Sequence, residues 1–79
     1  MAVNYDKDLA VFLDIVTVHE ADDLLAWVQN TQGSRVDLAA CAHLHPANLQ
    51  ILLAAGTQVT RWPADSALAA WLKTVLEPH

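Results

Sequence analysis

The segment Cys-Ala-His-Leu-His, which begins at Cys41, is the stretch of this 79-residue chain whose side chains could do chemistry. Cys41, His43 and His45 alternate, so an extended backbone would place all three on one side. Thiolate and imidazole groups suit zinc, but a fourth ligand would have to come from His19 or His79. We favour the alternative that Cys41 is a small buried residue and that the histidines lie in a solvated loop.

Cys41 and His43 could also form a cysteine–histidine pair for nucleophilic catalysis. The partners of such pairs come from separate elements rather than from neighbouring positions. Pro46 removes one N–H donor from the start of the following helix, and no glycine-rich oxyanion loop follows. With only Gly33 and Gly56, the chain also lacks a phosphate-binding glycine loop. We therefore expect no catalytic residues, no metal site and no cofactor.

Two single aspartates interrupt otherwise apolar stretches and are the remaining candidates for a ligand or an acid. These are Asp14 and Asp37. We favour the interpretation that each lies at the wet end of a strand or accepts a hydrogen bond from a neighbouring N–H. Asp22 and Asp23 are neighbours in a predicted helix and point apart, so they do not form a pair of cooperating carboxylates.

The composition predicts one small folded domain over residues 1–79, with residues 1–8 frayed. Hydrophobic residues make up 54% of the chain and charged residues 16%, which excludes a disordered chain. The longest apolar run covers residues 67–72, far short of the about 18–20 residues that a bilayer span needs. Charged residues precede the first apolar stretch, so we expect no signal peptide and no membrane insertion.

The charge and the single cysteine limit the classes of partner. The formal net charge is −5 and the four Lys and Arg residues are scattered, which argues against a nucleic-acid partner. One cysteine excludes an internal disulfide and, with no signal peptide, favours a cytoplasmic location. A chain this short cannot bury so large a share of apolar residues by itself. We therefore predict that it forms a homodimer or binds another protein.

Apolar patterns along the chain alternate between the periods of strands and helices. They predict strands over residues 9–18, 35–41 and 57–62 and helices over residues 21–30, 46–55 and 64–76. The first strand is almost continuously apolar, so we expect burial on both faces. Pro46 suits the first helical position and Gly56 the residue after the helix end. The order β-α-β-α-β-α predicts an α/β fold, a small open and largely parallel sheet with helices packed against it.

The stretch Val36–Ala55, VDLAACAHLHPANLQILLAA, resembles the signature of the STAS domain, named for sulfate transporters and anti-sigma factor antagonists. In that family a strand ending in hydrophobic-Asp-Leu-Ser is followed by a short loop, and an Asp-Ser-Ser-Gly type tetrapeptide opens a helix reading Leu-x-x-Leu-Leu-Ala. Aligned without gaps, Asp37 and Leu38 match the strand end, residues 45–48 occupy the tetrapeptide, and residues 49–53 match the helix.

The resemblance implies a STAS-like fold and a bacterial signalling protein that binds an anti-sigma factor or kinase. In antagonists of this family the kinase phosphorylates a Ser or Thr of the tetrapeptide, whereas Pro46 and Ala47 carry no hydroxyl. The chain is also shorter than typical members, so an N-terminal strand is expected to be missing. A binding surface without the switch remains, with free N–H groups at residues 47–49. We expect it to comprise His43, Leu44, His45, Pro46, Ala47 and Asn48.

Two other functions remain open. One is an accessory subunit of a larger complex, such as an ABC-type transporter. The resemblance implies this function too, because phospholipid and sulfate transport systems use STAS domains as accessory parts. A self-assembling structural domain belongs to the same class. The other is a pH-sensitive contact at His43 and His45, because histidine is the side chain that can change its charge near neutral pH.

Overall fold

Four strands form one mixed sheet in the computed structural model, which describes residues 2–76. In spatial order they are β1 (Val3–Tyr5), β2 (Leu9–Val16), β3 (Arg35–Leu44) and β4 (Gln58–Arg61). Strands β2, β3 and β4 run parallel, whereas β1 pairs antiparallel with β2. The helices are the short 3-10 helix η1 (Val18–Glu20), α1 (Ala21–Gln29), α2 (Pro46–Ala55) and α3 (Ser66–Leu76).

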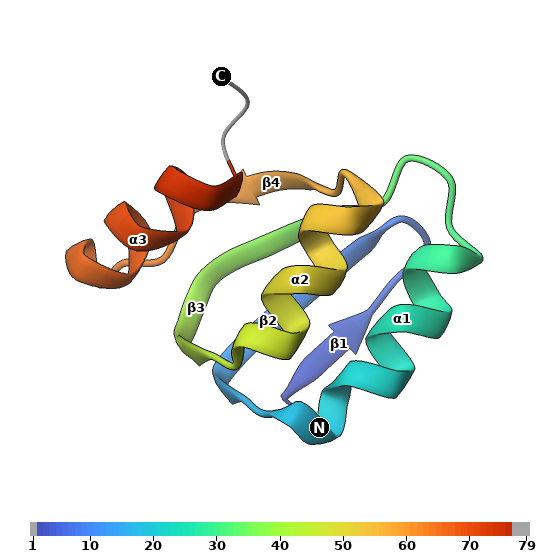
Figure 1. The fold of residues 1–79 in the computed structure, drawn as a ribbon, viewed down its shortest axis with the longest axis horizontal. Helices are drawn as coiled ribbons and strands as arrows, with labels where there is room; N and C mark the ends of the chain where they lie inside the picture. The colour runs from blue at the N-terminus through green and yellow to red at the C-terminus, as the bar shows by residue number, and fades with distance from the viewer. Residues whose placement is uncertain (1, 77–79) are drawn as a thin grey trace.

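Helices α1 and α2 lie on the same face of the sheet (Figure 1). Two right-handed crossovers that advance in one direction along a sheet put both helices on one side. Helix α3 lies beside β4 at the edge of the sheet, and the described residues are only 19 Å thick along the shortest axis. The predicted small α/β fold with helices against a sheet is confirmed, but the sheet is mixed and has four strands.

The N-terminal residues form strand β1, so the prediction that residues 1–8 are frayed is wrong for Val3–Tyr5. Val3 pairs with Phe12 and is buried, and the Tyr5 ring lies 5.5 Å from that of Trp27. The domain therefore supplies its own N-terminal strand, contrary to the expectation that one is missing. Three residues are too few for a recognisable alternation. Met1 and residues 77–79 lie outside the described residues.

Strand β2 is buried on one face only, so the prediction of burial on both faces is wrong. Ala10, Phe12 and Val16 are buried, whereas their neighbours are half-buried or exposed. The strand also ends at Val16, two residues earlier than predicted, because the Thr17 hydroxyl accepts a hydrogen bond from the backbone N–H of His19 and caps η1. When helices cover only one face of a sheet, buried and more exposed residues alternate along a strand even if both faces are apolar.

The α2 boundaries agree with the prediction because both ends carry strong local signals. Pro46 is the first residue of α2, and Gly56 ends it with a left-handed φ of 64°. Helix α3 begins at Ser66, two residues later than predicted, and the Asp65 carboxylate accepts a hydrogen bond from Leu68 N–H at 2.9 Å. Strand β3 extends three residues further than predicted, to Leu44, because it continues to pair with β2.

One apolar core joins the sheet to the helices. Its largest fully buried side chains come from β2, β3 and all three longer helices, namely Phe12, Leu24, Leu38, Leu44, Leu52 and Leu72. Leu72 anchors α3, and the Lys73 ammonium lies 5.6 Å from the centre of the Trp62 ring. The core therefore fixes the carboxyl ends of β2 and β3, where the candidate site lies.

Candidate functional site

The predicted binding segment lies where β2 and β3 end and the chain turns into η1 and α2. Ile15 and Val16 pair with His43 and Leu44, and the backbone N–H of His45 donates to Val16 O at 2.9 Å. In parallel α/β sheets this carboxyl edge is the usual place for ligands and partners. Its position was predictable from the element order.

The six predicted binding residues differ in how much of each side chain reaches the surface. His43 and Pro46 are exposed, and His45 and Ala47 are half-buried. Leu44 and Asn48 are buried, so Leu44 packs in the core and does not offer the apolar contact that we expected. The accessible part of the segment is therefore His43, His45, Pro46 and Ala47.

The start of α2 is closed by its own residues. Nδ1 of His45 accepts a hydrogen bond from the backbone N–H of Ala47 at 3.0 Å. The His45 carbonyl oxygen accepts from Asn48 N–H at 2.9 Å and from Leu49 N–H at 3.3 Å. The expectation of free N–H groups at residues 47–49 is therefore wrong, and this helix start offers no ready anion site. The cap also requires a neutral imidazole with its proton on Nε2.

Asn48 ties α2 to the end of β2 from inside the protein. Its side-chain Nδ2 donates to Thr17 O at 2.8 Å and lies 3.5 Å from Val16 O. The residue is 0% exposed, and its Oδ1 has no hydrogen-bond partner among the described residues. A buried amide that bridges two chain segments fixes their relative position, because separating the segments would leave the buried amide without a hydrogen-bond partner.

Cys41 and His43 do not converge on a site. Cys41 is buried and its thiol donates to the carbonyl oxygen of His43 at 3.4 Å, whereas the imidazole of His43 is exposed. A register shift between Asp14 and Ile15, opposite these residues, breaks the strict alternation on which the metal hypothesis depended. Burial raises the pKa of the Cys41 thiol, which disfavours the reactive thiolate.

The possible metal ligands are dispersed. Within residues 2–76 no group of three or more His, Cys, Asp or Glu side chains is close enough together to hold a metal ion. His79, one of the two candidates for a fourth ligand, lies outside the described residues.

The two aspartates that interrupt the apolar strands, Asp14 and Asp37, do not form a common site. Oδ1 of Asp37 accepts a hydrogen bond from Ala39 N–H at 2.9 Å, and its Oδ2 lies 4.0 Å from Nε of Arg61. This confirms the local hydrogen-bond interpretation for Asp37. Asp14 is exposed and has a left-handed φ of 52° between the two register shifts of β2.

An excess of apolar side chains was predicted, but not which of them would be exposed. Val18 is 47% exposed on η1, which packs beside α2. A groove of about 560 Å³ lies between α1 and α2, and its lining residues are Leu25, Val28, Gln29, Gln50, Ile51, Ala54 and Ala55. Leu24 and Leu25 both belong to the apolar stripe of α1, but only Leu24 is buried. The adjacent pair Leu24 and Leu25 was the sequence feature that could have predicted this exposure, because neighbouring residues of a helix do not point in the same direction.

Comparison of the chain with protein-family models, with curated proteins and with solved structures gives no significant match. Among the residues described, no helix combines the length and apolar character needed to cross a bilayer.

Proposed function

We propose that this chain is a non-enzymatic protein–protein interaction module. Its docking face is the α2-start surface, which we define as Val18, His43, His45, Pro46 and Ala47. The observation that carries the proposal is the buried Asn48 amide, which holds the turn after β2 against α2. It keeps exposed apolar groups and two imidazoles in one arrangement before any partner arrives.

A surface held in this way suits recognition because little conformational entropy is lost on binding. Val18 and Pro46 supply apolar area, and the imidazoles of His43 and His45 supply polar groups. An apolar centre with a polar rim is the usual composition of a docking site. Burial raises the pKa of the Cys41 thiol, which argues against this thiol as a nucleophile.

The partner that we propose is a regulatory protein of the anti-sigma or kinase type, from the resemblance to STAS domains. Pro46 and Ala47 occupy the positions where that resemblance expects the phosphorylated hydroxyl. The capped helix start also offers no free N–H groups to a phosphate. We therefore propose that phosphorylation at this turn does not switch the association.

A second candidate is an accessory subunit of a larger assembly, such as a transporter complex. The groove between α1 and α2 favours it, because this groove is a second apolar surface, formed by the C-terminal halves of the two helices. Leu25 and Leu53 are 42% and 44% exposed on these helices. A subunit enclosed by several neighbours would cover more than one such face.

Ala47→Asp tests the proposal, and Ala67→Asp is its matched control. Both alanines are the second residue of a helix, where a carboxylate interacts favourably with the helix dipole, so both variants should fold. The native chain and both variants are used to retain proteins from an extract of the source cells, and the retained proteins are identified by mass spectrometry.

We expect the native chain and Ala67→Asp to retain the same protein and Ala47→Asp to lose most of it. An ATPase of the kinase type among the retained proteins favours the regulatory module, and a transporter ATPase favours the accessory subunit. Equal retention by the three proteins would remove the α2-start surface from the interface.

A further inference from the structure

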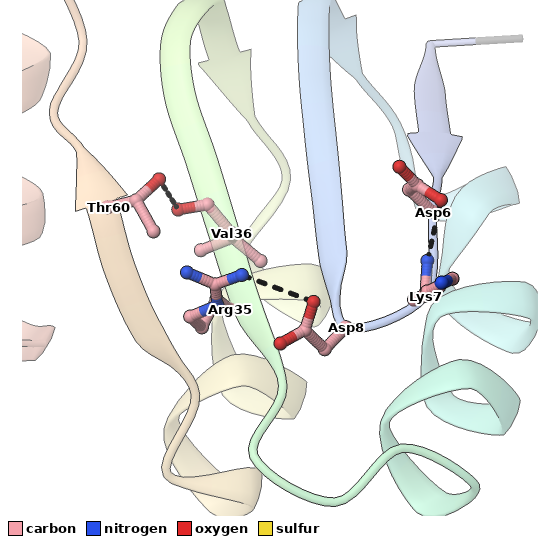
Figure 2. Close-up of polar contacts among 6 residues, drawn as sticks. All are labelled: Asp6, Lys7, Asp8, Arg35, Val36 and Thr60. Atoms are coloured by element: carbon pink, nitrogen blue, oxygen red, sulfur yellow. Dashed lines mark hydrogen bonds and ion pairs between the residues drawn. The ribbon is translucent and has the colours of Figure 1, made fainter.

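The sheet face opposite α1 and α2 has no covering layer within residues 2–76. Figure 2 looks onto this face, with the strands in front and α1 and α2 behind them. The shortest dimension of 19 Å agrees with one sheet and one layer of helices. All-parallel sheets are usually covered on both faces, and three of the four strands run parallel here, so the uncovered face needs an explanation.

The centre of this face is apolar. Because Ala10 and Phe12 are buried beneath the helices, Leu9 and Val11 point the other way. Register shifts interrupt the alternation after Val11, but Leu13 and Ile15 line one open hollow together with Ala42. These residues form what we call the open-face stripe: Leu9, Val11, Leu13 and Ile15. Ile15 is 58% exposed, the largest exposure among the bulky apolar residues described. At this end of the stripe, Ala2, Leu13, Asp14, Ile15 and Ala42 line an open hollow of about 570 Å³.

Four charged side chains around the stripe form two ion pairs, whereas the exposed Asp14 beside Ile15 has no ion-pair partner among the described residues. Nη2 of Arg35 donates to Oδ1 of Asp8 at 3.2 Å, as Figure 2 shows, and Arg61 lies 4.0 Å from Asp37. Two of the chain's four cations are thus paired with carboxylates on this face. A second copy would bring the same two ion pairs, and little net repulsion would arise between these pairs. Each cation could also pair with a carboxylate of the other copy.

The area of the face lies at the lower limit for a dimer. The strands have 3, 8, 10 and 4 residues, and with a rise of about 3.3 Å per residue and a spacing of about 4.8 Å they give a planar footprint of about 400 Å² per copy. The planar area of two copies is about 800 Å², and the side chains that project from the strands add accessible surface towards the about 1,000 Å² of a specific interface.

We propose that a second copy of this chain packs its sheet face onto this one, forming a homodimer with four layers, helix–sheet–sheet–helix. The two open-face stripes lie against each other about 10 Å apart, as in other stacked sheets. A two-fold axis lets the same patch serve on both copies, which suits a face that carries paired charges of both signs. The proposal does not depend on the α2-start surface.

Sedimentation equilibrium of the native chain, Ile15→Lys and Leu53→Lys tests the proposal. Leu53 is the matched control because it is a bulky apolar residue of comparable exposure on the helix layer. The native chain and Leu53→Lys should sediment with twice the 8.6 kDa of one chain. Ile15→Lys should raise the dimer Kd at least about 100-fold, because the interface contains the residue twice.

Ile15→Thr is a second variant in case Ile15→Lys does not fold. Threonine keeps the branched side chain that strands favour, so this variant should fold. It should raise the dimer Kd about 10-fold with an unchanged circular dichroism spectrum. A native chain that stays monomeric up to about 1 mM would overturn the proposal. Dissociation by Leu53→Lys but not by Ile15→Lys would overturn it as well. Ala47→Asp, which tests the other surface, should remain dimeric.

Discussion

Replacing Asn48 by aspartate tests whether this buried side chain holds the start of α2. In the native chain Nδ2 donates to Thr17 O at 2.8 Å and lies 3.5 Å from Val16 O. The substitution exchanges this donor for an oxygen, so an ionised carboxylate would face two carbonyl oxygens at a position that solvent does not reach. The helix would remain possible, but the contact with the end of β2 would become repulsive.

The expected loss is large for a domain of this size. An uncompensated buried charge costs about 3–5 kcal/mol. The first helical turn offsets about 0.5–1 kcal/mol of this cost for a carboxylate. The difference, about 2–4 kcal/mol, compares with a total free energy of unfolding of about 4–12 kcal/mol for 79 residues.

The loss should depend on pH in a defined direction. Burial raises the pKa of the introduced carboxyl, so the folded variant holds its proton more tightly than the unfolded chain. A group with a raised folded pKa contributes stability below its unfolded pKa and loses it as the pH rises through the folded pKa. The protonated carboxyl can also donate to Thr17 O. The deficit relative to the native chain should therefore be small near pH 4 and complete at about pH 7.

Urea unfolding followed by tryptophan fluorescence measures this deficit for each protein at both pH values. Asn48→Ala is the control, because it removes the hydrogen bond without adding a charge. Thr17 O and Val16 O still accept from Glu20 N–H and His45 N–H, so this variant should lose only about 1–2 kcal/mol at either pH. An Asn48→Asp protein within about 0.5 kcal/mol of the native chain at neutral pH would refute the reasoning.

Three further predictions concern single groups. The phenolate absorbance of Tyr5, the only tyrosine, should titrate at about 12, because burial and then the charges of Glu20 and Asp23 raise its pKa; a midpoint near 10 in the folded protein would contradict the structure. The folded state should accordingly lose stability as the pH rises from about 10 to 12. His45→Ala should lower the free energy of unfolding by about 1 kcal/mol and His45→Asn by much less, since asparagine restores the cap; equal losses would contradict the capping role. Iodoacetamide should alkylate native Cys41 at least about 10-fold more slowly than the unfolded chain, because burial raises the thiol pKa and blocks access.

The helices were predictable because local signals mark them. Pro46 and Gly56 delimit α2, and the boundaries follow from backbone chemistry alone. The strand endings depended instead on pairing. His43 and Leu44 belong to β3 only because β2 lies alongside, and β1 exists because Val3 finds Phe12 across a turn. Neither pairing is visible in the composition of its segment.

The candidate site was predictable in position but not in detail. The element order indicated that the turn before Pro46 lies at the carboxyl ends of parallel strands. The sequence could not show that Asn48 points inward or that the His45 ring turns back to cap its own helix. Both depend on the exact meeting of the β2 end with α2, which is a tertiary contact.

Hydrogen–deuterium exchange of the isolated chain and of its complex with the protein that it retains from cell extract tests the central claim most directly. The α2-start surface predicts that slower exchange on binding is confined to the backbone amides of residues 17–20 and 43–49. Protection in the C-terminal halves of α1 and α2, with those two segments unchanged, would contradict it and assign the contact to the groove between these helices.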